Sequence, residues 1–360
     1  MCGVIASNKV RKDFSLALQE LQHRGPDYVC IENWSEVQIG FCRLAIRGLG
    51  NDGNQPFFCE CGRWSIIYNG EISNWSELMT KFAFSKNGTC DGQIIAPLLC
   101  HLGVSAFSLL KGMFAIIAHD RVSGKYFGVR DPFGIKPLYL WQASGQWSLS
   151  SEIQPLLKMY SPKISLDSIK HFFTFGFLSP RQSGFENLTL IEPGKILVFD
   201  LLNKIDEIKI NLFQTPTQIS ANTNLKTKLS EIIAKNCESD ITMALAYSSG
   251  FDSNLIATLL SEQKVPIQLI HIASSTEHQE AELVKKYAAR HNLDLSIYSI
   301  DTSEIILEDY FTRMDRLTFD GLNSYLVSRA VSFHNIKTFL TGHGGDEFLR
   351  GYKFAQKRYA

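Results

Sequence analysis

The chain has 360 residues, and at about 150 residues per domain this length favours two globular units, with three as the alternative. Its 36 Lys and Arg residues balance its 36 Asp and Glu residues, which argues against a nucleic-acid-binding protein held by phosphate contacts, and its hydrophobic fraction of 45% argues against a disordered chain. No run of about 18 uncharged apolar residues predicts a membrane span, and no secretory signal opens the chain, so we expect a cytoplasmic protein without a membrane partner.

The 8 cysteines are scattered along the chain, as is typical of reduced cysteines in a cytosolic protein. Cys59 and Cys61 form a Cys-x-Cys pair, but no second pair follows at the spacing of a zinc site. We therefore expect no metal there, and we expect most of the other cysteines to be small buried hydrophobes.

Residues 1–210 show short apolar or alternating runs that are broken by Gly, Pro and Asn. Examples of predicted strands are 37–46, 64–68, 113–118, 125–129 and 196–199, and two helices are predicted at 73–84 and 93–102. Many strands with few helices favour stacked sheets that carry helices on their outer faces. Residues 211–224 are rich in Gln, Thr, Ser and Asn, and we interpret them as a linker.

In residues 225–360, strands and helices alternate. The predicted strands are 241–246, 266–272, 293–300 and 336–340, and the predicted helices are 252–261, 279–291 and 322–332. This alternation indicates a parallel sheet with crossover helices. Ligands of such sheets bind at the carboxyl ends of the strands.

The chain opens with Met1, Cys2 and Gly3. If Met1 is removed, Cys2 carries both a thiol and a free α-amine, whose ordinary pKa values are about 8.5 and 7.7–8.0. The amine can then take the thiol proton near neutral pH, so that the nucleophile has its own base. By itself, a cysteine at the second position is a weak signal for this chemistry.

Further motifs follow Cys2 in order: His23-Arg24-Gly25-Pro26-Asp27, Arg43-Leu44-Ala45-Ile46, Gln55-Pro56, Asn69-Gly70-Glu71-Ile72, Asp91 and Arg130-Asp131-Pro132-Phe133-Gly134. Together they resemble the N-terminal-nucleophile glutaminase domain of class II glutamine amidotransferases. The resemblance implies an αββα sandwich over about residues 1–200. It departs at Phe41, where the family often has His.

This resemblance implies that Cys2 attacks the side-chain amide of glutamine and forms a thioester. Asn69 and the Gly70 N–H would hold the oxyanion. The planar fork of Arg43 suits the α-carboxylate of glutamine, and Glu71 and Asp91 are candidates for its α-ammonium group. Two other parts of the motifs, Gly25-Pro26 and 130–134, are expected to shape loops.

A second motif, Ser248-Ser249-Gly250-Phe251-Asp252-Ser253, follows a predicted strand and opens a helix. Such a turn directs N–H groups and the positive end of the helix dipole towards phosphate. It resembles the Ser-Gly-Gly-x-Asp-Ser loop of PP-loop ATPases, which release pyrophosphate. Ser249 stands where that family has Gly, and its Cβ could crowd the phosphates.

The run from Thr341 to Glu347, followed by Gly351-Tyr352, resembles the corresponding loop of asparagine synthetases. The resemblance implies an ATP site in which Tyr247 and Ile272 lie near the base and ribose, and Thr341 and Gly342 lie across the nucleotide. The phosphates would lie on the loop 248–253, here called the serine loop, through Ser248, Ser249, Gly250, Asp252 and Ser253. Asp252 and Asp346 are suited to Mg²⁺.

Together the two halves resemble a glutamine-hydrolysing asparagine synthetase, an ATP-consuming ligase that uses glutamine, Mg²⁺ and a carboxylate acceptor, most simply aspartate. The family continues well beyond the Gly-Tyr pair, so we expect an incomplete synthetase domain; neither Lys353 nor Lys357 matches the catalytic lysine of the family. His343 stands where asparagine-forming members often have Glu. Two alternatives stay open: a glutaminase with a degenerate synthetase half, and a non-catalytic glutamine- or nucleotide-binding protein. The expected partners are small molecules, and a homodimer is compatible with the sequence.

Overall fold

A computed structural model describes residues 1–84, 89–200, 204–209, 211–212, 224–274, 278–300, 307–318, 321–349 and 351. The chain forms two compact units. Unit 1 comprises Met1–Thr217 together with Met314–Phe319, and unit 2 comprises Gln218–Arg313 together with Asp320–Ala360. The linker expected at 211–224 lies largely outside the described residues, as does Tyr352.

Unit 1 contains two six-stranded sheets, with the strand orders β10-β8-β9-β1-β3-β2 and β12-β11-β7-β6-β5-β4. The strands of the first sheet are β1 (Gly3–Ser7), β2 (Tyr28–Trp34), β3 (Val37–Arg43), β8 (Tyr139–Ala143), β9 (Gln146–Ser150) and β10 (Leu188–Leu190). Those of the second are β4 (Phe57–Phe58), β5 (Trp64–Ile72), β6 (Gly112–Asp120), β7 (Lys125–Arg130), β11 (Ile196–Phe199) and β12 (Ile205–Ile208). The paired strands of both sheets are antiparallel.

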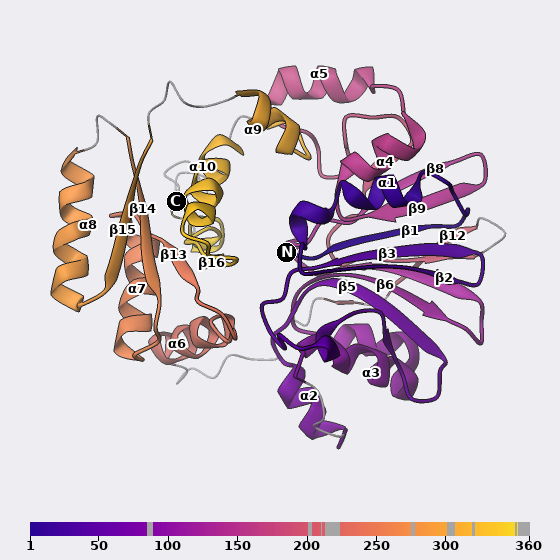
Figure 1. Cartoon of the computed structure of the whole chain (residues 1–360), viewed down its shortest axis with the longest axis horizontal. Coiled ribbons are helices and arrows are strands. Elements are labelled where there is room, and N and C mark those ends of the chain that lie inside the picture. The colour runs from indigo at the N-terminus through magenta and orange to yellow at the C-terminus, as the bar shows by residue number, and fades with distance from the viewer. Residues whose placement is uncertain are drawn as a thin grey trace, which may run out of the picture. The chain divides into compact units, whose positions relative to one another are not determined.

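Alternation along the strands gives each sheet two buried faces. Between the sheets lies a core to which β1, β3, β5, β6 and β7 contribute. On the outer face of the first sheet, α1 (Phe14–Gln19) and α4 (Ile153–Tyr160) cover a second core. On the outer face of the other sheet, α2 (Trp75–Lys81) and α3 (Ile95–Leu102) cover a third. These four layers, seen in Figure 1, confirm the predicted αββα sandwich.

Unit 1 holds more helix than the sequence predicted. Besides the two expected helices, it contains α1, α4 and α5 (Leu166–Phe175), so the prediction of two helical stretches was wrong. These three helices have 6, 8 and 10 residues, and about two to three helical turns show little of the 3.6-residue period.

The helical stretch Asp91–Leu109 is long and apolar enough to cross a membrane by length and composition. In unit 1 it is not one straight helix but α3 flanked by the 3₁₀ turns η3 (Asp91–Ile94) and η4 (Gly103–Leu109). Its apolar side chains pack under the second sheet; Ile94, Leu98, Leu99 and Phe107 are almost fully buried there. Burial in a core explains the composition of this stretch.

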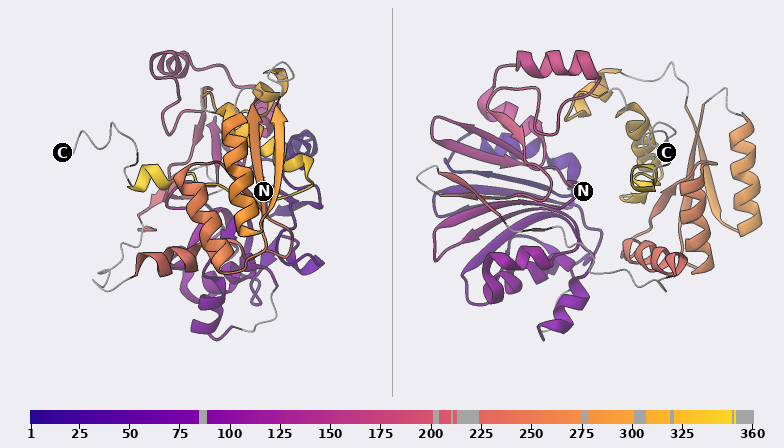
Figure 2. Two further views of the ribbon diagram at one scale, coloured as in Figure 1. Left: turned by 90° about the vertical axis from the view of Figure 1, so that its left-hand side faces the viewer. Right: turned by 180° about the vertical axis from the view of Figure 1, so that it is seen from behind.

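Unit 2 is built on a parallel sheet of order β15-β14-β13-β16, which confirms the predicted α/β architecture. Its strands are β13 (Ala244–Ala246), β14 (Gln268–Ser274), β15 (Asp294–Ile300) and β16 (Phe339–Leu340). Its helices are α6 (Leu225–Asn236), α7 (Phe251–Glu262), α8 (His278–His291), α9 (Leu307–Arg313), α10 (Gly321–Phe333) and α11 (Gly345–Leu349). α7 and α8 cover one face of the sheet and α10 covers the other, as Figure 2 shows.

Candidate active site

Cys2 precedes β1 and packs at the edge of the core between the two sheets of unit 1. Its half-buried Sγ accepts a hydrogen bond from the Leu44 N–H at 3.4 Å, and the Leu44 carbonyl oxygen lies 3.8 Å from Sγ. Burial raises the pKa of the Cys2 thiol, whereas Leu44, the α-amine and the nearby Arg24 and Arg43 act in the opposite direction. The surroundings therefore favour a neutral thiol until a base takes its proton.

The beginning of the chain lies among buried cations. Arg24 is 8% exposed and donates from Nε to the Cys2 carbonyl oxygen at 3.0 Å, and Lys136 is 7% exposed with Nζ 3.0 Å from Met1 Sδ. Burial, reinforced by Arg24 and Lys136, lowers the pKa of the Met1 α-amine to about 5. Burial also lowers the pKa of Lys136 to about 8. The Met1 α-amine is therefore mostly neutral at pH 7, whereas Lys136 stays mostly charged.

Lys136 owes its position to the motif Arg130-Asp131-Pro132-Phe133-Gly134. The fully buried Asp131 carboxylate accepts N–H hydrogen bonds from Phe133 at 3.0 Å, Ile135 at 3.0 Å and Lys136 at 2.9 Å. The Arg130 guanidinium donates to the Lys136 carbonyl oxygen at 2.8 Å. The loop thus directs Lys136 towards the beginning of the chain.

Asn69 and Gly70 lie near the end of β5, which the sequence had predicted to end at residue 68. Asn69 is 1% exposed, and its Nδ2 has no hydrogen-bond partner among the described residues. A buried amide donor without a partner is costly, so the unpaired Nδ2 of Asn69 points to a ligand oxygen. At Gly70 an added Cβ would lie 2.2 Å from the Met113 carbonyl oxygen, so only glycine fits.

Cys2 lies within electrostatic reach of this strand end. Burial raises the pKa of Tyr68 well above its usual value, and the neighbouring Asp91 and, to a smaller extent, Cys2 add to the rise. Tyr68 directly precedes Asn69 in β5. The half-buried Glu71 follows Gly70 and contributes to the field at Lys136.

Asp91 anchors the same strand from η3. It is 4% exposed, and its carboxylate accepts hydrogen bonds from the Tyr68 hydroxyl at 2.9 Å and the Ile72 N–H at 2.6 Å. Burial raises the pKa of Asp91. Through these two hydrogen bonds, Asp91 holds β5 in place on both sides of Asn69 and Gly70.

Arg43 ends β3 with its guanidinium enclosed by a loop. Nη1 donates to the Gly50 carbonyl oxygen and to Asn54 Oδ1, both at 2.7 Å, and Nη2 donates to the Gly48 carbonyl oxygen. Gly53 leaves room for the guanidinium, since an added Cβ would lie 2.0 Å from Nη2. The fork is held rigidly, and protein oxygens already occupy part of it.

A polar cluster beneath Cys2 was not assigned from the sequence. Arg24 Nη1 donates to Glu152 Oε1, which His23 Nε2 also contacts at 3.1 Å, while the buried Arg24 Nη2 has no partner among the described residues. Burial and the nearby Glu152 raise the pKa of Asp315 to about 7, and its Oδ1 accepts the Ile153 N–H at 3.0 Å. His23 and Arg24 stood in a recognised motif, but Glu152 and Asp315 carried no sequence signal.

In unit 2, the serine loop connects β13 to α7. Ser253 is 5% exposed, and its Oγ accepts the Ser248 N–H at 3.2 Å and donates to the Ser248 carbonyl oxygen at 2.8 Å. Ser249 is exposed, and both its N–H and its Oγ donate to Glu280 Oε1 of α8, at 2.9 and 3.1 Å. A carboxylate thus occupies donors that would otherwise be open to a phosphate oxygen.

The structure brings Asp252 against the loop after β16. An added Cβ at Gly345 would lie 2.4 Å from Asp252 Oδ2, and one at Gly342 would lie 2.9 Å from Asp252 Cβ, so two glycines form a cradle for this carboxylate. Asp346 follows in α11 and is exposed. Two carboxylates beside a glycine-rich loop are a donor set that suits a hard cation such as Mg²⁺.

Tyr247 and Ile272 are more buried than Ser249 and Asp346. The Tyr247 ring lies in the core of unit 2 with its centroid 5.4 Å from that of Tyr287, and its hydroxyl donates to Asn254 Oδ1, so this side chain is enclosed. Ile272 belongs to β14 and packs at the edge of the α10 core. Thr341 follows β16, and its Oγ1 lies 3.2 Å from His343 Nδ1. Each lies in or directly after a strand of the parallel sheet.

Residues 1–207 match the family described as "Glutamine amidotransferase domain". The chain belongs to the glutamine amidotransferase family. Residues 224–360 match the family described as "Asparagine synthase". The chain thus joins an amidotransferase domain to an asparagine synthase domain, as the motifs predicted.

The curated relatives of this amidotransferase are distant. A Methanocaldococcus jannaschii protein named provisionally as glutamine-hydrolysing asparagine synthetase 2 is 26% identical, with 98% of this chain and 76% of that protein covered. Glutamine-hydrolysing asparagine synthetase 1 of Bacillus subtilis is 25% identical, with 93% and 55% covered. Amidase chry2 of Gibberella zeae is 22% identical, with 96% and 56% covered. The chain therefore spans little more than half the length of the second and third of these relatives.

Proposed function

We propose that this protein is a glutamine-dependent, ATP-consuming amide ligase of the cytoplasm, with aspartate as the acceptor and asparagine, AMP and pyrophosphate among its products. The observation that carries the glutaminase half of the proposal is the buried Asn69 amide, whose Nδ2 has no partner among the described residues. Asn69 lies in β5 directly after Tyr68, whose pKa the nearby Cys2 helps to raise. An orphaned donor in that place suits an oxyanion that exists only during the reaction.

In the glutaminase step, removal of Met1 leaves the α-amine on Cys2. The burial, reinforced by Arg24 and Lys136, that lowers the pKa of the Met1 amine would favour a neutral amine there as well. The amine takes the thiol proton, and Sγ forms a bond to the amide carbon of glutamine. The amide oxygen becomes an oxyanion, which Asn69 Nδ2 and the Gly70 N–H stabilise. The amine then protonates the leaving nitrogen, the C–N bond breaks, ammonia departs, and water hydrolyses the thioester to glutamate.

Substrate glutamine carries two charges that the site must hold. Arg43 is the residue that we assign to the α-carboxylate, through the part of its guanidinium that the Gly48–Asn54 loop leaves available. We assign the α-ammonium to Glu71 and Asp91. Asp91 already accepts from the Ile72 N–H and the Tyr68 hydroxyl, so its contribution would be mainly electrostatic.

In the ligase step, the serine loop would bind the phosphates of ATP, and Thr341 and Gly342 would lie across the nucleotide. Asp252 and Asp346 would hold Mg²⁺, which neutralises the charge that develops on the pyrophosphate leaving group. The acceptor carboxylate attacks the α-phosphorus of ATP and displaces pyrophosphate; ammonia then attacks the acyl carbon and displaces AMP. Ammonia must reach the acyl carbon unprotonated, because ammonium is not a nucleophile.

One observation favours a second candidate, a glutaminase whose synthetase half does not turn over. Glu280 is hydrogen-bonded to both the N–H and the hydroxyl of Ser249, in the loop that would bind phosphate. Unless this carboxylate moves, it opposes the binding of an anion there. This candidate predicts glutamate without pyrophosphate.

The deciding experiment supplies the purified chain with glutamine, Mg²⁺-ATP and aspartate and measures glutamate, pyrophosphate and asparagine, beside a Cys2→Ala variant given glutamine or ammonia. The ligase predicts all three products from the unchanged chain, and asparagine from the variant with ammonia only. Glutamate alone would support the second candidate. No product at all would contradict both and leave a binding protein.

A further inference from the structure

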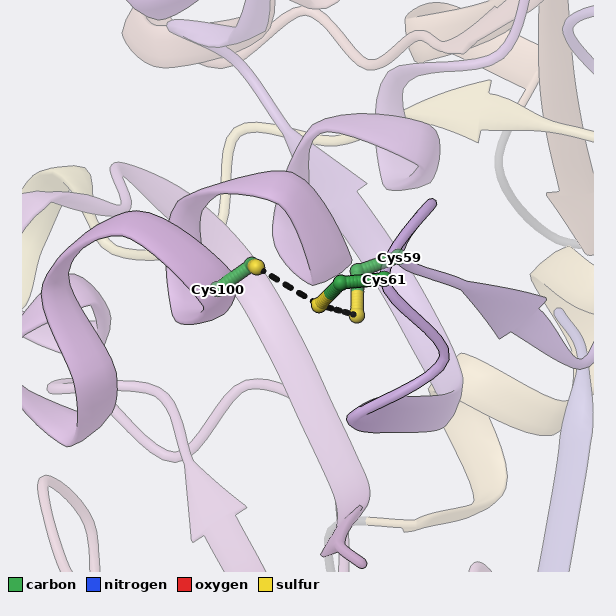
Figure 3. A group of neighbouring side chains, drawn as sticks. All are labelled: Cys59, Cys61 and Cys100. Atoms are coloured by element: carbon green, nitrogen blue, oxygen red, sulfur yellow. Dashed lines mark hydrogen bonds between the residues drawn. The ribbon is translucent and has the colours of Figure 1, made fainter. Parts of the chain in front are cut away.

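Three cysteine side chains that are far apart in the sequence converge on the surface of unit 1. Cys59 and Cys61 lie in the turn between β4 and β5, and Cys100 lies near the end of α3 (Figure 3). The Sγ atoms of Cys59 and Cys61 are 3.2 Å apart, those of Cys61 and Cys100 are 2.9 Å apart, and all three lie within 4.8 Å of one another. The Cys-x-Cys pair that lacked a partner in the sequence therefore has one in the fold.

This cysteine cluster (Cys59, Cys61 and Cys100) has a buried side and an open side. Cys59 is 4% exposed and belongs to the core under the second sheet, whereas Cys61 and Cys100 are exposed. The Trp64 N–H donates to Cys59 Sγ at 3.0 Å. A main-chain N–H directed at sulfur is the outer-shell contact that orients a metal-bound thiolate and stabilises its charge.

We propose that the cysteine cluster binds one thiophilic d¹⁰ metal ion, for which Zn²⁺ is the reference, with a fourth position open to solvent. Thiolates are the ligands that such ions prefer. With Zn–S bonds of about 2.3 Å in a tetrahedral arrangement, the sulfurs would lie about 3.8 Å apart. The observed sulfurs are 2.9 and 3.2 Å apart, so each pair opens by less than about 1 Å through side-chain torsions.

A metal accounts for more of the geometry than a disulfide does. A bond between Cys61 and Cys100 would use the closer pair of sulfurs but would give no role to Cys59 or to the N–H that it accepts. On binding, each thiol gives up its proton to solvent and becomes an anionic ligand, with no change of oxidation state. Three thiolates and Zn²⁺ then carry a net charge of about −1.

The bound ion would tie together two segments that are far apart in the sequence. Cys61 and Cys100 are separated by 39 residues, and the ion would clamp the β4–β5 turn onto α3, the helix that covers the second sheet. The cluster lies at the Trp64 end of β5, whereas Asn69 and Gly70 lie near the other end. We therefore expect the metal to stabilise unit 1 without entering the glutaminase chemistry.

The test uses the full chain with Cys2→Ala, so that the nucleophile cannot bind metal, after reduction and removal of bound metal. Cobalt is added under anaerobic conditions and the sulfur-to-cobalt charge-transfer band is recorded; zinc per chain is measured by mass spectrometry after reloading and desalting. We expect about one ion per chain, a charge-transfer intensity typical of thiolate ligation, and a rise in the unfolding temperature on loading.

Cys61→Ser and Cys100→Ser, both at exposed positions, should abolish stoichiometric binding and the rise in unfolding temperature. Cys30→Ser is the matched control, because Cys30 is a partly exposed cysteine of β2 outside the cluster, and it should bind as the parent does. Binding that survives in the Cys61 and Cys100 variants would overturn the proposal. So would a reduced parent that binds no cobalt, or a native protein in which peptide mapping finds Cys61 and Cys100 joined as a disulfide.

Discussion

Asn69 is the residue on which the glutaminase proposal depends most directly. Asn69→Ala removes one donor to the oxyanion, so we expect kcat for glutamate release to fall by about 10²–10³-fold while KM for glutamine changes little. Asn74→Ala is the matched control: Asn74 is also buried, but its amide is already bonded to the Leu109 carbonyl oxygen and the Lys111 N–H, each at 2.9 Å. That variant should lose stability and keep its kcat. Equal losses of kcat in the two would contradict the assignment of Asn69.

Glu280 offers a second test on a single residue, this time on α8 beside the serine loop of unit 2. Glu280→Gln removes the negative charge from the donors of Ser249, so we expect KM for ATP in pyrophosphate release to fall several-fold, where tenfold corresponds to about 1.4 kcal/mol. The control is Glu282→Gln on the same helix, whose exposed carboxylate pairs with Lys285 at 2.8 Å. A KM that rises in Glu280→Gln would show that the carboxylate holds the loop in its binding shape instead.

Among the elements, β6 carries a histidine that should make unit 1 sensitive to acid. His119 is 2% exposed and is stacked on Tyr126 with ring centroids 4.2 Å apart; burial lowers its pKa to about 4. As the pH falls below about 6.5, His119 is protonated in the unfolded chain but stays neutral in the folded one, because its folded pKa is about 4. The free energy of unfolding therefore decreases between pH 6.5 and pH 4. His119→Phe keeps a ring in the stack, and we expect it to lower the midpoint pH of acid unfolding.

The matched control for this prediction is His101→Phe on α3, where the imidazole is exposed and contacts Phe82 and Phe84. It should leave the acid midpoint unchanged. Acid unfolding followed by tryptophan fluorescence gives the comparison. A midpoint that is the same in His119→Phe and in the unchanged chain would show that other groups control acid unfolding.

The helices and strands also show which parts of the fold could be predicted from the sequence. Long segments with a clear period were predicted closely, as 279–291 was for α8 (His278–His291), because several turns repeat the same pattern. β5 extends beyond its predicted end because Asn69 and Gly70, which look like turn residues, pair with Ala115 and Phe114 of β6. The cluster of Cys59, Cys61 and Cys100 could not be predicted, since only the packing of α3 against the second sheet brings Cys100 there.

Residues of the candidate site could be proposed from the sequence where they stand in a motif. Residues that only tertiary contacts bring to the site could not. Cys2, Asn69 and Gly70 were proposed as site residues because each stands in a short motif, and their roles stay predictions. Glu152 reaches Arg24 across 128 residues of sequence, and Asp315 joins them from a segment that follows most of unit 2. No local pattern records such contacts. The hydrogen bond between Glu280 of α8 and Ser249 of the serine loop likewise depends on how α8 packs.

At the scale of the whole molecule, unit 1 is not continuous in sequence, because Met314–Phe319 belongs to it although the preceding and following residues belong to unit 2. The half-buried Arg316 donates from Nη2 to the carbonyl oxygens of Leu178 at 2.9 Å and Ser179 at 2.7 Å. Two charge-assisted hydrogen bonds to main-chain carbonyls anchor this returning segment. The stability of the amidotransferase fold should therefore depend on a residue of the second half of the chain.

Tryptophan fluorescence isolates this effect, because all 5 tryptophans, at 34, 64, 75, 141 and 147, lie in unit 1. We expect Arg316→Ala to lower the free energy of unfolding of the fluorescence-detected transition by about 1–3 kcal/mol, since it leaves two partly buried carbonyl groups without their donor. Arg313→Ala is the control: Arg313 belongs to unit 2 and makes an exposed ion pair with Asp309 at 2.9 Å, which contributes little to stability. Denaturant titrations of the two variants and the unchanged chain make the measurement. If Arg316→Ala unfolds with the same midpoint and slope as Arg313→Ala, the returning segment does not support unit 1; if only Arg316→Ala shifts the transition, a substitution beyond residue 300 controls the unit that carries Cys2.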